Sequence, residues 1–213
     1  MKTLLPLLSL VLLGANVADA AIIGSFESVT SESGFTPPTG FVTSDLAVNS
    51  STDWLAANLV LNLTSGSIYQ DALLSGFGPP SSALVNAIPS TRFDTYVTGS
   101  TGLAGGAPSS AGGAVDLGGS PVAAFDTSKI NLNWFTTSTT DIGQFTIGRF
   151  TLSSDAVGTF SLRLDSLQQS GPFLLSGTIE NGVFTAVPEV NSIVMLSAVA
   201  LVGVGARRIY RRA

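Results

Sequence analysis

The sequence predicts an all-β protein, an antiparallel β-sandwich, flanked by an N-terminal signal peptide and a single C-terminal transmembrane helix. Short runs in which apolar and polar residues alternate are separated by Gly, Ser, Thr, Asn and Asp. This pattern is typical of antiparallel strands joined by turns, as in sandwiches and barrels. The chain has no cysteine, so its stability must come from a core without disulfides.

The predicted strands share a two-residue alternation of apolar and polar side chains. They cover residues 54–64, 130–134, 145–152, 160–165, 173–179 and 183–186. Residues 145–152 are apolar on both faces, which suits a central strand. Residues 81–88 lie between prolines and predict one or two helical turns with a serine cap. Residues 99–120 contain eight glycines and one charged residue, and they predict a surface loop without the glycine spacing of a nucleotide site.

The N-terminus has the three parts of a secretory signal peptide. Lys2 provides the positive start, and residues 4–13 form an apolar stretch interrupted by one proline and one serine. Ala18 and Ala20 flank Asp19 in a small-x-small cleavage site. We therefore expect residues 1–20 to be removed, so that the exported protein begins at Ala21.

The C-terminus combines a short polar motif, an apolar run and a basic end. Val187, Pro188 and Glu189 precede the run at residues 190–206, whose 17 residues are at the short end of the ~17–25 that span a membrane. Basic residues would hold its end on the cytoplasmic side. They are Arg207, Arg208, Arg211 and Arg212.

This order of motif, helix and basic end resembles the PEP-CTERM sorting signal, although Val190 stands where that family has its second proline. The resemblance implies an exosortase-like processing peptidase as partner, with cleavage near Pro188 and Glu189. It also implies a cell-surface or extracellular-matrix protein associated with exopolysaccharide. An uncleaved membrane anchor is the alternative. The predicted organisation is a signal peptide at 1–20, a β-sandwich at 21–185 and a sorting and anchoring tail at 186–213.

A second resemblance lies in residues 144–185. This stretch contains Phe-Thr-Ile-Gly-Arg-Phe-Thr-Leu, then Gly-Thr-Phe-Ser-Leu-Arg-Leu, then Gly-Thr-Ile-Glu-Asn-Gly-Val-Phe-Thr. The series is similar to the closing strands of cohesin-like sandwiches, in which a final Asn-Gly turn closes a jelly roll, so the resemblance implies a jelly-roll or cohesin-like β-sandwich. The resemblance supports the architecture and does not transfer dockerin binding.

The composition excludes several classes of function. Between residues 21 and 187 there are four basic and twelve acidic residues, so no basic surface is available to bind nucleic acid. Histidine is absent along with cysteine, which excludes the usual zinc, copper and haem ligands, cysteine nucleophiles and Ser/His/Asp triads. We therefore expect a protein without catalytic residues or cofactors.

Aspartates are the remaining candidates for chemistry. A glycosidase needs two carboxylates ~5–9.5 Å apart, and the available ones are Asp53, Asp71, Asp94, Asp126 and Asp141. Each lies near a turn or strand edge, where aspartate commonly caps the backbone, and we interpret them as structural. Arg92 and Asp94, two positions apart, would pair on one face of a strand. A calcium site stays open but has no location, because no Asp-x-Asp-x-Asn-Gly loop occurs.

Sugar binding is an alternative that needs no catalytic residue, because aromatic rings can stack on sugars. Trp134 continues the apolar face of residues 130–134 and is predicted to lie in the core. Trp54 and Tyr69 are less constrained and are the predicted glycan contacts. The sequence thus favours an exported structural or binding protein. The first alternative is an ectodomain like a carbohydrate-binding module, with extracellular polysaccharide as partner, and the second is a carboxylate-dependent polysaccharide-degrading enzyme.

Overall fold

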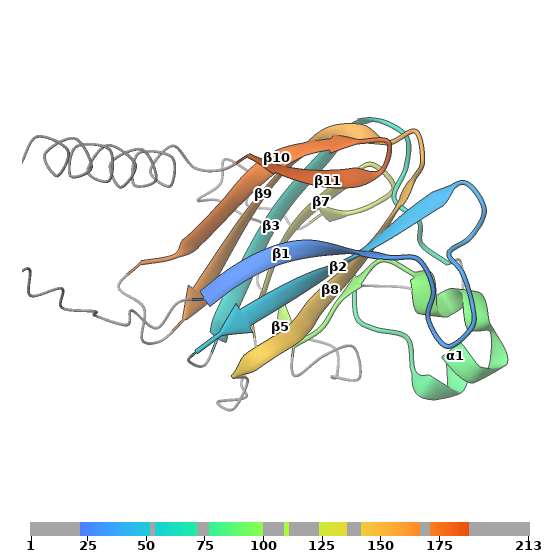
Figure 1. Cartoon of the computed structure of the whole chain (residues 1–213), viewed down its shortest axis with the longest axis horizontal. Coiled ribbons are helices and arrows are strands. Elements are labelled where there is room, and N and C mark those ends of the chain that lie inside the picture. The colour runs from blue at the N-terminus through green and yellow to red at the C-terminus, as the bar shows by residue number, and fades with distance from the viewer. Residues whose placement is uncertain are drawn as a thin grey trace, which may run out of the picture.

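The computed structural model describes residues 22–51, 54–71, 77–99, 109–110, 124–135, 142–166 and 171–187. These residues form two antiparallel sheets that face each other, shown in Figure 1. The predicted signal peptide, the transmembrane run and the basic end lie outside the described residues. In the described part, no helix has the length and apolar character needed to cross a membrane.

The smaller sheet has four strands in the order β1-β2-β8-β4. They are β1 (Ile22–Val29), β2 (Phe41–Ser50), β8 (Gly143–Ser153) and β4 (Tyr96–Val97). β8 lies between β2 and β4 and is buried along most of its length, so the prediction of a central strand at residues 145–152 is confirmed.

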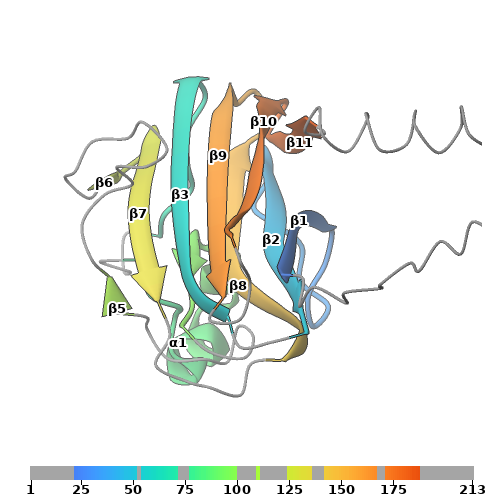
Figure 2. The same cartoon turned by 90° about the vertical axis from the view of Figure 1, so that its left-hand side faces the viewer.

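The larger sheet has seven strands in the order β11-β10-β9-β3-β7-β5, with β6 also paired to β7. They are β11 (Val183–Val187), β10 (Phe173–Glu180), β9 (Val157–Ser166), β3 (Trp54–Ser65), β7 (Lys129–Phe135), β5 (Ser109–Ser110) and β6 (Ala124–Phe125). Figure 2 shows β7, β3, β9 and β10 side by side in one layer.

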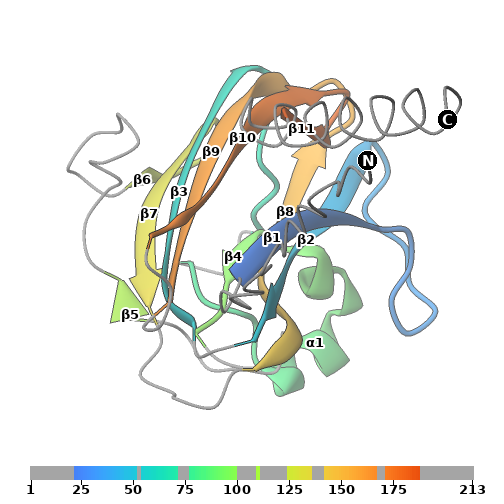
Figure 3. The ribbon, with the colours of Figure 1, turned by 60° about the vertical axis from the view of Figure 1, so that its left-hand side comes forward.

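The all-β prediction is confirmed, and each of the six predicted strands is present. β1 and β2, which pair with each other over eight positions, were not predicted. The predicted helical turns are also confirmed, because α1 (Ser82–Ala87) begins after Ser81, whose Oγ accepts a hydrogen bond from the Leu84 amide at 3.2 Å. A 3-10 helix, η1 (Pro89–Phe93), follows it. Figure 3 shows α1 outside the two sheets. Of the glycine-rich stretch, the structure describes the end at Gly99 and the two residues of β5.

A cluster of four phenylalanines joins the two sheets. Phe26 of β1 stacks on Phe184 of β11 with ring centroids 3.9 Å apart and an interplanar angle of 3°. The edges of Phe150 in β8 and Phe160 in β9 meet the same two rings. Such aromatic pairs add ~0.5–1.5 kcal/mol each to the gain from burial. The cluster therefore fastens β1 and β8 of the smaller sheet to β9 and β11 of the larger one.

The last hairpin ends at the predicted sorting motif. β10 and β11 are joined by Asn181 and Gly182, whose φ angles of 54° and 75° are those of the two-residue turn that the Asn-Gly sequence favours. The pairing of β11 extends to Val187, which lies opposite Ser176. The last described strand thus ends at the residue that begins the Val-Pro-Glu motif.

Candidate functional site

A groove on the outer face of the larger sheet is the candidate site. It lies over β9, β3 and β7, which are neighbours in the sheet and lie side by side in Figure 2. Ala57, Leu164 and Trp134 stand opposite one another in these strands and are buried in the core. Because successive side chains point to opposite faces of a sheet, the residues before and after them point outward.

Two consecutive rows of outward residues form the floor of the groove. The first row places Asn58 of β3 between Arg163 and Asn133, and the second places Ala56 between Asp165 and Phe135. Ala56 is much smaller than its two neighbours, so the sheet surface is hollowed there. These residues line a groove of about 290 Å³.

A β-bulge in β3 lies next to the groove. The register with β9 shifts between Trp54 and Ala56, which leaves Leu55 as the extra residue. Without the bulge, the alternation set by Leu59 and Leu61 would point Leu55 into the core and Trp54 outward. The bulge reverses this, because Trp54 is 1% exposed and Leu55 is 39% exposed.

The prediction that Trp54 contacts a glycan is therefore wrong. Its ring is enclosed in the core and packs near Phe145, with centroids 6.4 Å apart. Trp134 is fully buried, as predicted. Tyr69 is half-buried and lies beside the smaller sheet, where its amide donates to the Thr151 carbonyl at 2.8 Å and its ring meets the edge of Phe41. The structure thus does not bring Trp54 and Tyr69 together at one surface.

Charge is balanced within the groove. The Nε of Arg163 donates to Oδ2 of Asp165 at 2.9 Å, and its NH2 group donates to Oδ1 at 3.1 Å. The two side chains are 29% and 30% exposed, and a pair in such a position contributes only ~0–1 kcal/mol to stability. The pair therefore offers polar atoms of both kinds to the groove without a net charge.

Asn58 is the unusual residue of the groove. It is only 9% exposed, and its Oδ1 atom is buried without a hydrogen-bond partner. A buried acceptor left in this state costs ~1–3 kcal/mol. Nε1 of Trp134, on the neighbouring strand, is a second buried atom without a partner. The fold therefore makes no hydrogen bond with the Asn58 oxygen, although the side chain stands at the middle of the groove floor.

The predicted pairing of Arg92 with Asp94 on a strand is also wrong. Arg92 lies in η1 and Asp94 follows it as the helix cap. Oδ1 of Asp94 accepts a hydrogen bond from the Asp71 amide at 2.8 Å. Burial raises the pKa of Asp94 to about 7, and the nearby Asp71 carboxylate adds to the rise. Asp94 is 1% exposed, so its carboxyl group does not open onto a groove. It binds the backbone of the β3–α1 connection instead.

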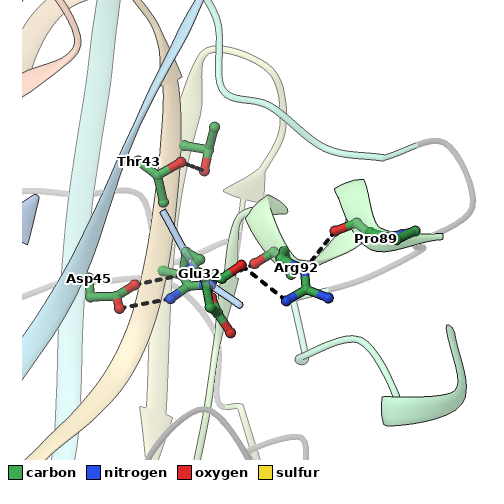
Figure 4. Close-up of polar contacts among 7 residues, drawn as sticks. Glu32, Thr43, Asp45, Pro89 and Arg92 are labelled. Carbon is green, nitrogen blue, oxygen red and sulfur yellow. Dashed lines mark hydrogen bonds and ion pairs between the residues drawn. The ribbon is translucent and has the colours of Figure 1, made fainter. Parts of the chain in front are cut away.

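The arginines near Asp94 hold the β1–β2 connection in place. Figure 4 shows Glu32 between Asp45 and Arg92 in this network. Arg149 binds Asp45 through two hydrogen bonds of 2.7 and 2.9 Å and also pairs with Glu32. Burial lowers the pKa of Arg149, but hydrogen bonds to Asp45 and Glu32 and the charges of Tyr96 and Asp45 raise it overall.

The guanidinium of Arg92 completes that network. Its Nε donates to the Pro89 carbonyl at 3.0 Å and its NH1 group donates to the Glu32 carbonyl at 3.3 Å. Its central carbon also lies 4.5 Å from the centre of the Phe35 ring. The contacts with Glu32 and Phe35 fix η1 to the β1–β2 connection, so we assign the cluster to the fold and not to a ligand.

The remaining predicted residues fall into two groups. Asp126 caps a turn as predicted, because its Oδ1 accepts from the Ser128 and Lys129 amides at 2.8 Å, and these bonds lower its pKa. Val187 ends β11 and is 55% exposed. The other predicted residues lie outside the described ones: Asp53, Asp141, Ala18, Ala20, Ala21, Pro188, Glu189, Arg207, Arg208, Arg211 and Arg212. Among the described residues, no group of three or more carboxylates is placed to hold a metal ion.

Sequence reasoning did not find the groove residues. Asn58, Asn133 and Arg163 each occupy the polar position of an alternating strand, which is the usual pattern of a solvated face. Only the strand register shows that they stand in one row. The weak signal in the sequence is the small Ala56 two positions before an asparagine in a strand that is otherwise rich in leucine.

The groove can hold an uncharged polar molecule by hydrogen bonds to amide, guanidinium and carboxylate groups. It contains a single carboxylate, Asp165, and that carboxylate is paired with Arg163, so the described lining has no pair of acids for glycosidic hydrolysis. No protein-family model matches this chain, and none of the curated proteins is significantly similar to it in sequence.

Proposed function

We propose that this is an exported cell-surface or extracellular-matrix protein of binding or structural type. A C-terminal sorting signal delivers it and directs its processing. The observation that carries the binding role is the groove on the larger sheet, whose floor contains the unused acceptor of Asn58. The signal-peptide pattern at residues 1–20 and the tail at residues 186–213 support export and attachment.

The proposed processing proceeds in three steps. The apolar tail halts in the cytoplasmic membrane, an exosortase-like peptidase cuts near Pro188 and Glu189, and the sandwich is released or passed to a surface acceptor. The last strand supports this order, because the β10–β11 pairs extend to Val187 and precede the cut. Cleavage at the motif would therefore leave every described strand intact.

The enzyme alternative has less support. Asp71 and Asp94 are adjacent, but the carboxylate of Asp94 is buried and bound to the backbone. A substrate could not reach it without opening the β3–α1 connection. Turnover of a polysaccharide that is lost in Asp94→Asn would favour the enzyme over the binding protein.

Cell fractionation tests the proposed location. We expect the native protein outside the cytoplasmic membrane, with Ala21 as its first residue. It should be digested when protease is added to cells with a permeabilised outer envelope.

Replacing Pro188 and Glu189 together with alanine should retain the chain in the membrane fraction at its larger, unprocessed mass. A matched change at Thr185 and Ala186 to serine should leave processing as it was. Full-length chain in the cytosol with its leader attached would contradict the proposal.

A further inference from the structure

We infer that the groove on the outer face of the larger sheet binds a neutral saccharide, with the Asn58 amide as the central contact. This inference rests on the proposed binding function and specifies the ligand class and the residues. It is carried by the coincidence of a hollow, a neutral polar lining and a buried acceptor without a partner at one place.

The size of the groove suits one sugar ring. Its volume of about 290 Å³ is at the small end of the ~300–1,000 Å³ of ligand pockets. The hollow exists because Ala56 stands between Phe135 and Asp165 in its row. Phe135 gives that row an apolar ring for the C–H face of a sugar, and Asp165 gives it oxygens that accept from hydroxyl groups. A pyranose has both kinds of surface.

The polar groups of the groove match a polyhydroxyl ligand in kind. Amides and a guanidinium–carboxylate pair carry donors and acceptors side by side, as do neighbouring hydroxyl groups on a sugar. The Asn58 oxygen can turn toward the groove, because the last torsion of an asparagine side chain is soft. A hydroxyl of the ligand would then donate the hydrogen bond that the fold does not supply.

Charge selects a neutral ligand over an acidic one. Arg163 is the cation of the described groove lining, and Asp165 balances it at 2.9 Å. Residues 21–187 have twelve acidic and four basic residues, so the surrounding field repels uronates and sulfates. Uncharged polysaccharides do not meet that barrier.

The position of Asn58 separates a binding role from a structural one. Its Oδ1 makes no hydrogen bond in the fold, so Asn58→Val removes a buried unsatisfied acceptor and supplies a good strand former. The variant should unfold at the same temperature as the wild type or a higher one, while its binding is lost. A structural asparagine would give the opposite result for stability.

Affinity electrophoresis of the full chain tests the inference. The chain is kept in a polyoxyethylene detergent, which has no sugar head group, and run in native gels that contain dextran, galactomannan, arabinoxylan, mixed-linkage β-glucan or alginate. We expect at least one neutral polysaccharide to slow the wild type. Asn58→Val and Ala56→Leu, which fills the hollow, should each weaken binding by about tenfold or more. Asn62→Val is the control, because Asn62 is exposed on the same strand and face but outside the groove.

Three results of the electrophoresis would overturn the inference. Equal mobility in all the neutral gels would exclude the ligand class, and slowing by alginate alone would exclude neutrality. Slowing that Asn58→Val and Ala56→Leu do not reduce would place binding elsewhere. If Asn58→Val fails to fold, Ala56→Leu still decides the site. A correctly delivered surface protein that binds none of the polysaccharides overturns this inference alone, whereas a cytosolic full-length chain overturns the proposed function.

Discussion

Asp94 is a buried carboxyl whose protonation is coupled to folding. Its pKa rises from the ordinary 3.8 to about 7, mainly because burial disfavours the charged form. The folded protein therefore binds this proton more tightly than the unfolded chain does. The resulting stability is fully present below about pH 4 and is lost as the pH rises through about 7.

Asp94→Asn should remove this pH dependence. Its amide oxygen can still accept the hydrogen bond from the Asp71 amide, which is 2.8 Å long in the wild type. We expect the unfolding temperature of the wild type to fall between pH 4 and 7.5 more steeply than that of the variant, measured by circular dichroism. Asp126→Asn is the matched control with the opposite sign. Hydrogen bonds lower the pKa of Asp126, so its contribution to stability is lost as the pH falls. Parallel curves for Asp94→Asn and the wild type would contradict the assignment.

The wrong prediction of a glycan contact at Trp54 has a local structural cause. The alternation of Leu59 and Leu61 correctly predicted β3 and its inward face. One extra residue, Leu55, then exchanged the faces at the start of the strand. No local signal in the sequence marks this bulge, so the sequence left the side of Trp54 unconstrained and did not reveal that the ring lies in the core.

At the scale of elements, the β10–β11 hairpin depends on a close approach of two strands. A Cβ atom on Gly177 would lie 2.0 Å from the Thr185 carbonyl oxygen and 2.8 Å from the Phe160 ring. The first neighbour is backbone of the paired strand and cannot move aside alone. A side chain at this position must therefore displace β11 and disturb the phenylalanine cluster to which Phe184 belongs.

Gly177→Ala should destabilise the protein by about 2 kcal/mol or more, measured by urea unfolding of the full chain with tryptophan fluorescence. Gly171→Ala is the matched control, because a Cβ atom there meets nothing within 4 Å, and its effect should stay within about 0.5 kcal/mol. Equal midpoints for the two variants would show that the hairpin is not held as tightly as the structure indicates.

The composition of β1 and β2 explains why the sequence did not predict these two strands. β2 buries Thr43 and Ser44 beside Leu46, Ala47 and Val48, and the Thr43 hydroxyl is 2.8 Å from that of Thr151, so its buried positions mix polar and apolar residues. In β1, the Cβ that Gly24 lacks would lie 2.8 Å from Leu164 Cδ1. An alternation of apolar and polar residues does not reveal a strand in which hydroxyl groups or a glycine occupy some of the inward positions.

At the scale of the whole molecule, sequence alone was enough for the class of fold and not for the groove. Alternation and turn residues are local properties, and they predicted the six strands at residues 54–65 and beyond residue 128. The groove depends on three strands that are far apart in the chain and on the register between them. Its central residue, Asn58, has the same polar position as Asn62, and only the neighbours in the sheet distinguish the two.

The groove and β11, the strand that precedes the proposed sorting motif, belong to the same sheet. The larger sheet has β11 at one edge, and β11 ends at Val187, the first residue of the proposed sorting motif. The groove lies over β9, β3 and β7, further along the same sheet. Processing at the motif should therefore leave the groove unchanged, so that precursor and processed protein bind the same ligand.

Mass spectrometry of the C-terminal peptide from native cells can decide whether the sandwich is delivered and processed through its tail. We expect a terminal peptide that ends near Val187 to Glu189. Recovery of mature protein that still carries Arg212 would contradict processing and identify a plain membrane anchor.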